Sequence, residues 1–239
     1  MKLLVDSFFS IPPLLQGTLL KRHFSPKLSA KIAKDIEKGE IDLQNGQRYH
    51  NLIFVKADLK NFTKLVDSTR DYIIIKSLME LYYKRIRKTI FRYEGMFDKF
   101  IGDAVIAVFG LPYYEADHTP TYALSCAREI ITVGYDIEQN WLSHIDVSPP
   151  EIGVRVGIAF GDGVMIRAGN EAEDLVMISN ELNLAQRLES EAPINGIRIS
   201  NRFYNLLGKP KHFRKEDLKI KGFSKKIVTW MEENSLKYI

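Results

Sequence analysis

Apolar side chains recur along the chain at two spacings, and the shorter spacing predicts strands. Apolar and β-branched residues make up most of residues 52–58, 97–109, 152–160 and 197–200, and turn-forming residues bound these runs. Such runs are typical of β-strands. Residues 97–109 hold two of them around Gly102-Asp103, which predicts a tight antiparallel hairpin with a carboxylate at its tip.

Apolar residues three and four positions apart predict helices elsewhere in the chain. Ser25 followed by Pro26 begins the first of these helices, and Gly39 can end it. Ser179 or Asn180 can cap the N-terminus of a later helix. The predicted helices cover about residues 25–39, 69–93, 119–141, 180–189 and 201–207.

Two further segments complete the order of the elements. Gly161-Asp162-Gly163 predicts a turn into a short strand over residues 164–166, and residues 213–230 predict a closing hairpin. The glycine pair lacks the Lys-Ser/Thr of a phosphate-binding loop. Strands and helices therefore intermix as β, α, ββ, α, β, β, α, β, α, ββ, which predicts an α+β fold with helices packed on a mostly antiparallel sheet.

Length and composition are typical of one folded domain with an extension. Hydrophobic residues are 45% of the 239 residues, enough for a packed core. We expect an N-terminal arm with a short helix over residues 1–46 and one domain over residues 47–239. A net charge of +4 suits a small anionic ligand and gives no argument for a nucleic-acid partner.

The cysteine count and the first twenty residues bear on location. The single cysteine, Cys126, excludes a disulfide within the chain, which is compatible with a reducing cytoplasm, and we expect it in the core. Residues 1–20 are apolar but interrupted, so we expect a soluble, cytoplasmic protein. Phe8, Phe9, Ile11 and Leu14 could form a peripheral membrane contact, but a contact with a partner subunit is the favoured interpretation.

Two carboxylates occupy the ends of predicted strands. Asp58 ends the strand over residues 52–58, where alternation places it on the same face as Lys56. Asp103 lies at the tip of the hairpin. Carboxylate oxygens are hard ligands that suit Mg²⁺ or Mn²⁺, so a divalent cation between the two strands is a natural hypothesis.

Four blocks of the sequence resemble the motifs of the class III nucleotide cyclases, the adenylate and guanylate cyclase family. The resemblance extends over roughly residues 48–231, and the blocks follow the family's order. It implies a ferredoxin-like core and conversion of a nucleoside triphosphate to a 3′,5′-cyclic nucleotide and pyrophosphate. The four blocks are residues 52–63, 97–110, 157–161 and 182–189.

The same resemblance implies a role for each matching residue. Asp58 and Asp103, with the backbone carbonyl of Leu59, would hold two divalent cations, Mg²⁺ or Mn²⁺. Asn183 matches the residue that orients the ribose, and Arg187 the one that stabilises charge on the α-phosphate. Because the family takes the metal-binding and Asn/Arg elements of one site from different subunits, we expect a homodimer with composite sites.

A phosphate-binding lysine and the loop residues near the phosphates are less clearly matched. The resemblance implies a lysine from the closing hairpin, and Lys219 and Lys221 are both candidates. Asn61 and Ile166 stand where the family usually has glycine. The replacement of glycine at these two positions removes no group that takes part in the reaction.

Base selection depends on three positions. Lys99 matches the lysine that reads adenine in adenylate cyclases, but Val176 replaces its usual acidic or hydroxyl companion and cannot accept from an amino group. Lys56 stands at a position that is usually aromatic or otherwise apolar, and it could contact the base, bind phosphate or form a salt bridge. Two ammonium donors without a nearby carboxylate suit the acceptors of uracil or cytosine. The sequence therefore favours the pyrimidine cyclases, a branch of bacterial anti-phage defence.

Two other functions remain open at this point. One is an adenylate cyclase, in which backbone carbonyls around Met177 bind the adenine amino group. The other is a cyclase-like module that binds a nucleotide or a partner without turnover. Retention of the four matched polar residues argues against the second alternative; they are Asp58, Asp103, Asn183 and Arg187.

Overall fold

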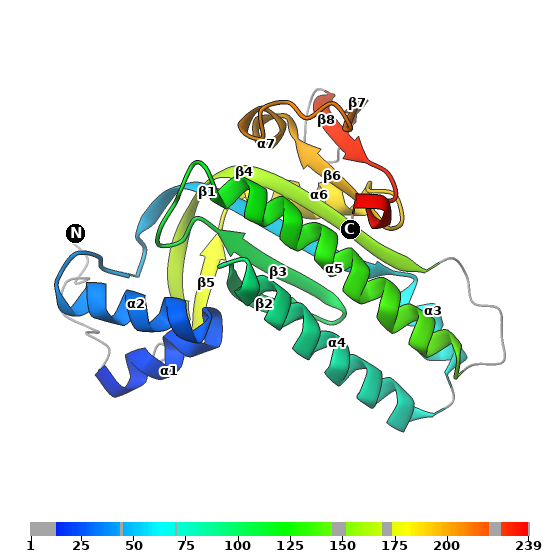
Figure 1. The fold of residues 1–239 in the computed structure, drawn as a ribbon, viewed down its shortest axis with the longest axis horizontal. Coiled ribbons are helices and arrows are strands. Elements are labelled where there is room, and N and C mark those ends of the chain that lie inside the picture. The colour runs from blue at the N-terminus through cyan, green and yellow to red at the C-terminus, as the bar shows by residue number, and fades with distance from the viewer. Residues whose placement is uncertain are drawn as a thin grey trace, which may run out of the picture.

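The computed structural model describes residues 13–43, 45–69, 71–144, 152–168, 174–219 and 226–238. Helices and strands alternate along most of this length (Figure 1). In chain order the elements are α1 (Pro13–His23), α2 (Pro26–Glu37), β1 (Arg48–Lys60), α3 (Phe62–Ser68), α4 (Tyr72–Arg92), β2 (Met96–Ile101), β3 (Ala104–Phe109), α5 (Thr119–Leu142), β4 (Gly153–Ala168), β5 (Asp174–Ile178), α6 (Asn180–Ser190), β6 (Gly196–Ser200), α7 (Asn201–Leu206), β7 (Arg214–Leu218), β8 (Ile227–Glu232) and a 3₁₀ turn (Ser235–Tyr238).

The described strands form one mostly antiparallel sheet, which confirms the predicted α+β class. Its order is β2-β3-β1-β4-β6-β8-β7, and β5 pairs with β4 outside this path. The first four strands and the helices between them follow the β-α-β-β-α-β order of ferredoxin-like domains, with every pair antiparallel. Only β6 is parallel to its neighbour β4 among the described pairs.

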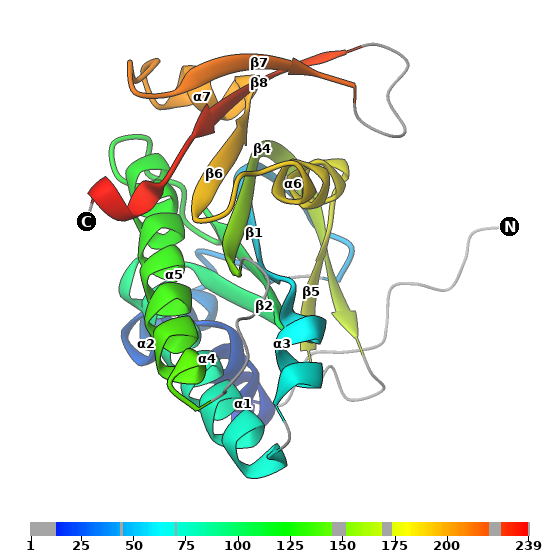
Figure 2. The same cartoon turned by 90° about the vertical axis from the view of Figure 1, so that its right-hand side faces the viewer.

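Alternate residues of β1 belong to two hydrophobic cores on opposite faces of the sheet. Val55 and Ala57 lie in a core with α4 and α5, which we call the α4/α5 core. Leu52 and Phe54 lie in a core with α1, α2 and α6, which we call the α6 core. This separation follows from the two-residue period of a strand. Figure 2 shows α6 on the opposite side of the sheet from α4 and α5.

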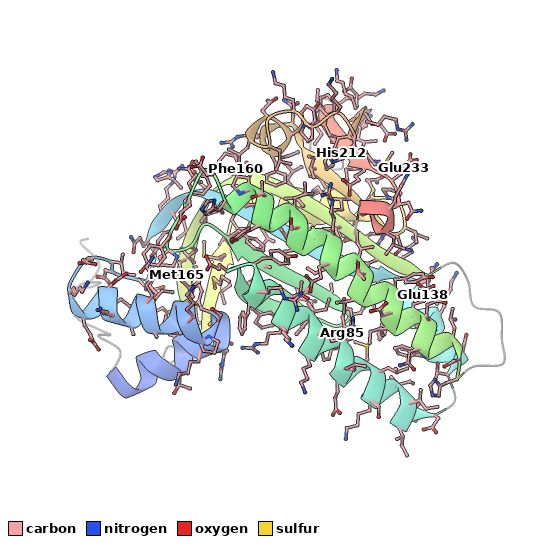
Figure 3. All side chains as sticks on the ribbon, in the orientation of Figure 1. Arg85, Glu138, Phe160, Met165, His212 and Glu233 are labelled. Atoms are coloured by element: carbon pink, nitrogen blue, oxygen red, sulfur yellow. The ribbon has the colours of Figure 1, made fainter. Side chains whose placement is uncertain are left out.

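Helices α4 and α5 lie side by side over their face of the sheet. Arg85 of α4, labelled in Figure 3, forms an ion pair of 2.6 Å with Asp136 of α5 at the surface. Beneath them the thiol of Cys126 is fully buried, as predicted, and burial raises its pKa. By the alternation of β1, these helices cover the face opposite to that of Lys56 and Asp58.

The hairpin over residues 97–109 forms as predicted, from β2 and β3. Gly102 takes a φ of +63° at its tip, a conformation that glycine adopts without strain. The hydroxyls of Tyr82 and Tyr83 on α4 donate to the backbone carbonyls of Asp103 and Gly102, at 3.1 and 2.9 Å. The tip is therefore fixed to a helix as well as to the sheet.

The structure corrects the sequence prediction around residues 161–163. Instead of a turn, β4 runs through Gly161 and Gly163 as one strand of 16 residues. A Cβ on Gly161 would lie 2.6 Å from the side chain of Glu181, and one on Gly163 would lie 3.0 Å from Phe54. The two glycines thus serve close packing in an extended strand. The sequence prediction also missed β5 and α3, and it began α4 too early.

The N-terminal segment joins the core of the domain. The side chains of Phe24 and Ile32, from the connection after α1 and from α2, are fully buried in the α6 core. Met165 of β4 belongs to the same core and lies on the side of the molecule where α2 packs (Figure 3). The predicted partner contacts through Phe8, Phe9, Ile11 and Leu14 fall outside the residues and side chains that the structure describes. Among the described helices, none has the length and apolar character needed to cross a membrane.

Candidate functional site

Asp58 and Asp103 lie together where β1 approaches its end and the β2–β3 hairpin turns. The backbone N–H of Leu59 donates to Asp103 Oδ2 at 3.0 Å, which attaches the hairpin tip to β1. Burial, followed by the charge of Asp58 and a hydrogen bond between the two carboxyl groups, raises the pKa of Asp103 to about 7. Two half-buried carboxyl groups that lie next to each other repel when both are ionised.

The chemistry of this pair suits a divalent cation. A cation between the carboxylates would offset both their repulsion and their burial. Within the described ranges, no three or more His, Cys, Asp or Glu side chains gather into a metal site. Mg²⁺ is typically held by one or two protein carboxylates together with water and substrate phosphates. The pair therefore fits a metal that is bound jointly with a nucleotide.

A buried network of ion pairs extends from Asp58 to α6. Arg155 Nη2 lies 3.1 Å from Asp58 Oδ2 and 2.8 Å from Glu189 Oε1, and Lys56 Nζ lies 2.9 Å from Glu189 Oε2. The Glu189 side chain is only 2% exposed. Sequence analysis missed Arg155 and Glu189. The register of β1 with β4, which places Asp58 opposite Arg155, is the signal that could have identified Arg155.

Glu189→Gln is expected to lower the free energy of unfolding by about 3 kcal/mol, because it leaves Lys56 and Arg155 with uncompensated buried charge. Urea unfolding measures the change. Lys56→Met is the control, with an expected loss below about 1.5 kcal/mol, since Glu189 keeps its contact with Arg155. Equal losses in the two variants would contradict this account of the network.

Helix α6 presents Asn183 and Arg187 away from its own sheet. Ser179 caps the helix through a hydrogen bond from the backbone N–H of Glu181, at 3.0 Å. Ala185 and Leu188 face the α6 core, whereas Asn183 and Arg187 lie on the opposite side of the helix, four residues apart. Asn183 is exposed and Arg187 is half-buried. Their side chains are therefore directed away from the strand face that carries Asp58.

Gly157 explains how closely α6 approaches the sheet. A Cβ at this position would lie 2.0 Å from the backbone oxygen of Ala185 and 2.4 Å from the backbone nitrogen of Glu189. Backbone atoms of a helix cannot move aside at such distances. The glycines of the block over residues 157–161 thus fix the depth of α6, and with it the position of the Lys56–Glu189 pair.

Lys56 and Lys99 share a row of the sheet. Both pair in register with Ile106 of β3, so they lie two strand spacings apart, about 10 Å. The expectation that neither ammonium group has a nearby carboxylate is wrong. Lys56 pairs with Glu189, and Lys99 Nζ lies 3.5 Å from Asp98 Oδ2. Sequence analysis overlooked Asp98, although it directly precedes Lys99.

The remaining sequence-predicted positions lie on several different elements. Val176 lies on β5, where it pairs with Ile166 of β4. Asn61 takes a left-handed φ of +62°, which asparagine tolerates better than most residues and which accounts for its presence at a usual glycine position. Lys219 follows β7, and Lys221 falls outside the described residues. Neither lysine is assigned to a phosphate.

Comparison with known families identifies a match over most of the chain. The model of the adenylate and guanylate cyclase catalytic domain matches residues 45–234. Among curated proteins, the uncharacterized protein Rv1319c of Mycobacterium tuberculosis is 25% identical over 166 residues, 69% of this chain. The soluble guanylate cyclase gcy-31 of Caenorhabditis elegans is 22% identical over 200 residues, 81% of this chain. The chain spans 28% and 27% of the lengths of these relatives.

Solved structures share the same fold. The adenylyl cyclase CyaB from P. aeruginosa is 26% identical, with a TM-score of 0.69 over 77% of this chain and 95% of that chain. The guanylyl cyclase Cya2 is 21% identical, with a TM-score of 0.67 over 79% of this chain and 93% of that chain. The guanylate cyclase domain of RhGC from Catenaria anguillulae, solved with GTP, has a TM-score of 0.62 at 21% identity and covers 77% of this chain and 97% of that chain.

Proposed function

Since this chain belongs to the adenylate and guanylate cyclase catalytic domain family, we propose that it is a metal-dependent nucleotide cyclase. It converts a nucleoside triphosphate to its 3′,5′-cyclic monophosphate and pyrophosphate. The observation that carries this proposal is the pair of carboxyl groups of Asp58 and Asp103, held together by the Leu59 N–H at the edge of the α6 face.

The chain's own residues have distinct roles in this reaction. Asp58 and Asp103 hold two divalent cations, Mg²⁺ or Mn²⁺, with the carbonyl of Leu59. When bound, these cations favour ionisation of the ribose 3′-hydroxyl and neutralise charge on the triphosphate. Asn183 orients the ribose so that the hydroxyl attacks in line with the departing pyrophosphate. The Arg187 guanidinium stabilises negative charge that builds on the α-phosphate.

We place Asn183 and Arg187 in the site of a partner subunit. Within one protomer they lie on the side of α6 that faces away from the sheet, whereas Asp58 is on the sheet face that α6 covers. A two-fold symmetric homodimer would bring the outer side of one α6 to the carboxylates of the other protomer. Such a dimer has two equivalent composite sites.

For the base, we propose a pyrimidine, as UTP or CTP. Val176 offers no acceptor to the amino group of adenine. The Lys56 side chain is 10% exposed and fills volume on the α6 face that a purine needs.

We expect the product to act as a second messenger in anti-phage defence. Phage challenge of cells that express the protein or its Asp103→Asn variant tests that role.

Adenylate cyclase is the second candidate, and Asp98 is the observation that favours it. Its carboxylate lies 3.5 Å from the Lys99 ammonium group, so the two side chains offer an acceptor beside a donor. Adenine presents the matching pair, a donor at its amino group beside an acceptor at N1.

The test is incubation of the purified protein with each of the four ribonucleoside triphosphates and Mn²⁺, followed by mass identification of the products. We expect cyclic UMP or cyclic CMP, and Lys56→Ala, which empties the volume of the lysine side chain, should shift preference toward purines by about tenfold. Cyclic AMP as the main product would support the second candidate. Bound nucleotide without any cyclic product would contradict the proposed enzyme, and unchanged preference in Lys56→Ala would contradict the role of Lys56.

A further inference from the structure

Buried side chains bind the edge of β5 that faces away from β4. Strand β5 pairs with β4 along one edge. On the other edge, the Leu175 N–H donates to His23 Nε2 at 3.0 Å and the Met177 N–H donates to Asp98 Oδ1 at 3.4 Å. These two donors flank Val176 in the sequence. Side chains from elsewhere in the chain thus take the place of a neighbouring strand.

His23, at the end of α1, connects β5 to β2. Its ring is 1% exposed, and burial lowers its pKa. Because Nε2 accepts from Leu175, the ring hydrogen lies on Nδ1, which is 2.8 Å from the backbone oxygen of Phe97 and donates to it. One imidazole therefore forms a hydrogen bond to each of two strands.

Asp98 makes a second connection between the same strands. The register of β2 with β3 shifts between Phe97 and Lys99, which makes Asp98 the extra residue of a bulge. Its side chain is fully buried, with Oδ1 near the Met177 N–H and Oδ2 near Lys99 Nζ. The bulge thus turns a carboxylate inward between β2 and β5.

Both connections adjoin the positions that the proposed function assigns to the base. Phe97 and Asp98 directly precede Lys99 on β2, and Leu175 and Met177 enclose Val176 on β5. The end of α1 is held in place by a 3.0 Å ion pair between Arg22 and Asp174. A change in the spacing of the two strands would therefore move Lys99 and Val176 relative to each other.

We propose that His23 and Asp98 are positioning residues that set the distance between Lys99 and Val176, and thereby the base selectivity of the enzyme. This inference rests on the proposed function. It gives the N-terminal segment a part in substrate choice, since His23 belongs to α1. Neither residue touches the reacting atoms, so each acts through the strand that it binds.

The experiment uses His23→Gln, His23→Asn and Asp98→Leu in the 239-residue chain. Leucine removes the acceptor for the Met177 N–H, which asparagine would keep. A Gln amide can reach one strand contact and an Asn amide the other, so each His23 variant loses one of the two hydrogen bonds. We measure kcat and KM for all four ribonucleoside triphosphates, together with nucleotide affinity in the presence of Ca²⁺. The ratio of kcat/KM between the best and second-best substrates should fall about tenfold, mainly through KM.

Phe24→Leu is the matched control, because Phe24 is fully buried in the same segment and its hydrocarbon side chain contributes apolar packing instead of hydrogen bonds. It should lower thermal stability while leaving the substrate ratio unchanged. An unchanged ratio in the His23 and Asp98 variants, or an equal change in Phe24→Leu, would overturn the inference while cyclase activity stands. If no cyclic product forms, the affinities for the four nucleotides provide the ratio. Failure of the wild-type protein to bind any nucleotide would overturn both proposals.

Discussion

Replacing Asp103 with asparagine is expected to reduce cyclic nucleotide formation by about a thousandfold or more. The amide keeps an oxygen that can accept from the Leu59 N–H, so the hairpin tip should stay in place. It removes one of the two negative charges that the proposed cations require. Initial rates with Mn²⁺ and the preferred nucleotide, measured for both proteins at equal concentration, test the expectation.

Asp162→Asn is the matched control for this variant. Asp162 is a carboxylate on β4 that pairs with Arg48 at 2.8 Å, outside the site. Its replacement should leave the rate within about twofold of the wild-type rate. A full rate in Asp103→Asn would contradict the assignment of the metal pair, and a comparable loss in Asp162→Asn would show that the effect is not specific to the site.

Stability should respond to Asp103→Asn in the opposite direction from activity. Burial and Asp58 raise the pKa of Asp103 to about 7 in the folded chain. A raised pKa means that the ionised form destabilises the fold, so wild-type stability falls as pH rises from about 4 to about 7. Asparagine removes this effect. In metal-free buffer the variant should therefore be the more stable protein at pH 8.

The sequence was sufficient to predict the hairpin, which follows from local patterns: a two-residue period in each strand, and a Gly-Asp pair at the turn. The meeting of its carboxylate with Asp58 was a hypothesis from ligand chemistry and the family resemblance, because it requires the pairing of β1 with β3. The cap at Ser179 likewise follows from local hydrogen-bond chemistry. The assignment of Asp58, Asp103, Asn183 and Arg187 to a cyclase site came from the family resemblance.

Other features depended on contacts between distant parts of the chain. Gly161 and Gly163 suggested a turn in sequence, whereas in the fold they leave room for Glu181 and Phe54. The partner of Lys56 is 133 residues away in the chain, so its ion pair could not be read from neighbouring residues. That contact requires the register of β1 with β4 and the depth of α6, which Gly157 sets.

The packing of the N-terminal segment on the domain also could not be predicted from the sequence. Its composition and its proline and glycine residues indicated an arm ahead of the domain. In the fold, Phe24 and Ile32 enter the α6 core, and His23 bonds to β2 and β5. Apolar residues in a short helix do not specify which surface they cover, because only tertiary packing decides that.

The composite site predicts that two inactive variants restore activity when they form mixed dimers. Asp103→Asn lacks a metal ligand, and Arg187→Ala lacks the guanidinium, so each homodimer should be inactive. A mixed dimer contains one site with both wild-type elements and one site with neither. With random pairing, half of the dimers are mixed, and the total activity should reach about a quarter of the wild-type value.

The measurement that tests the central claim most directly is therefore the cyclase rate of the two variants after coexpression, compared with each variant alone at the same total concentration. Size-exclusion chromatography verifies that the coexpressed chains are dimeric. The account predicts recovery of about a quarter of the wild-type rate. A mixture of dimers no more active than the separate variants would contradict the claim that Asp58 and Asp103 of one protomer act with Arg187 of its partner.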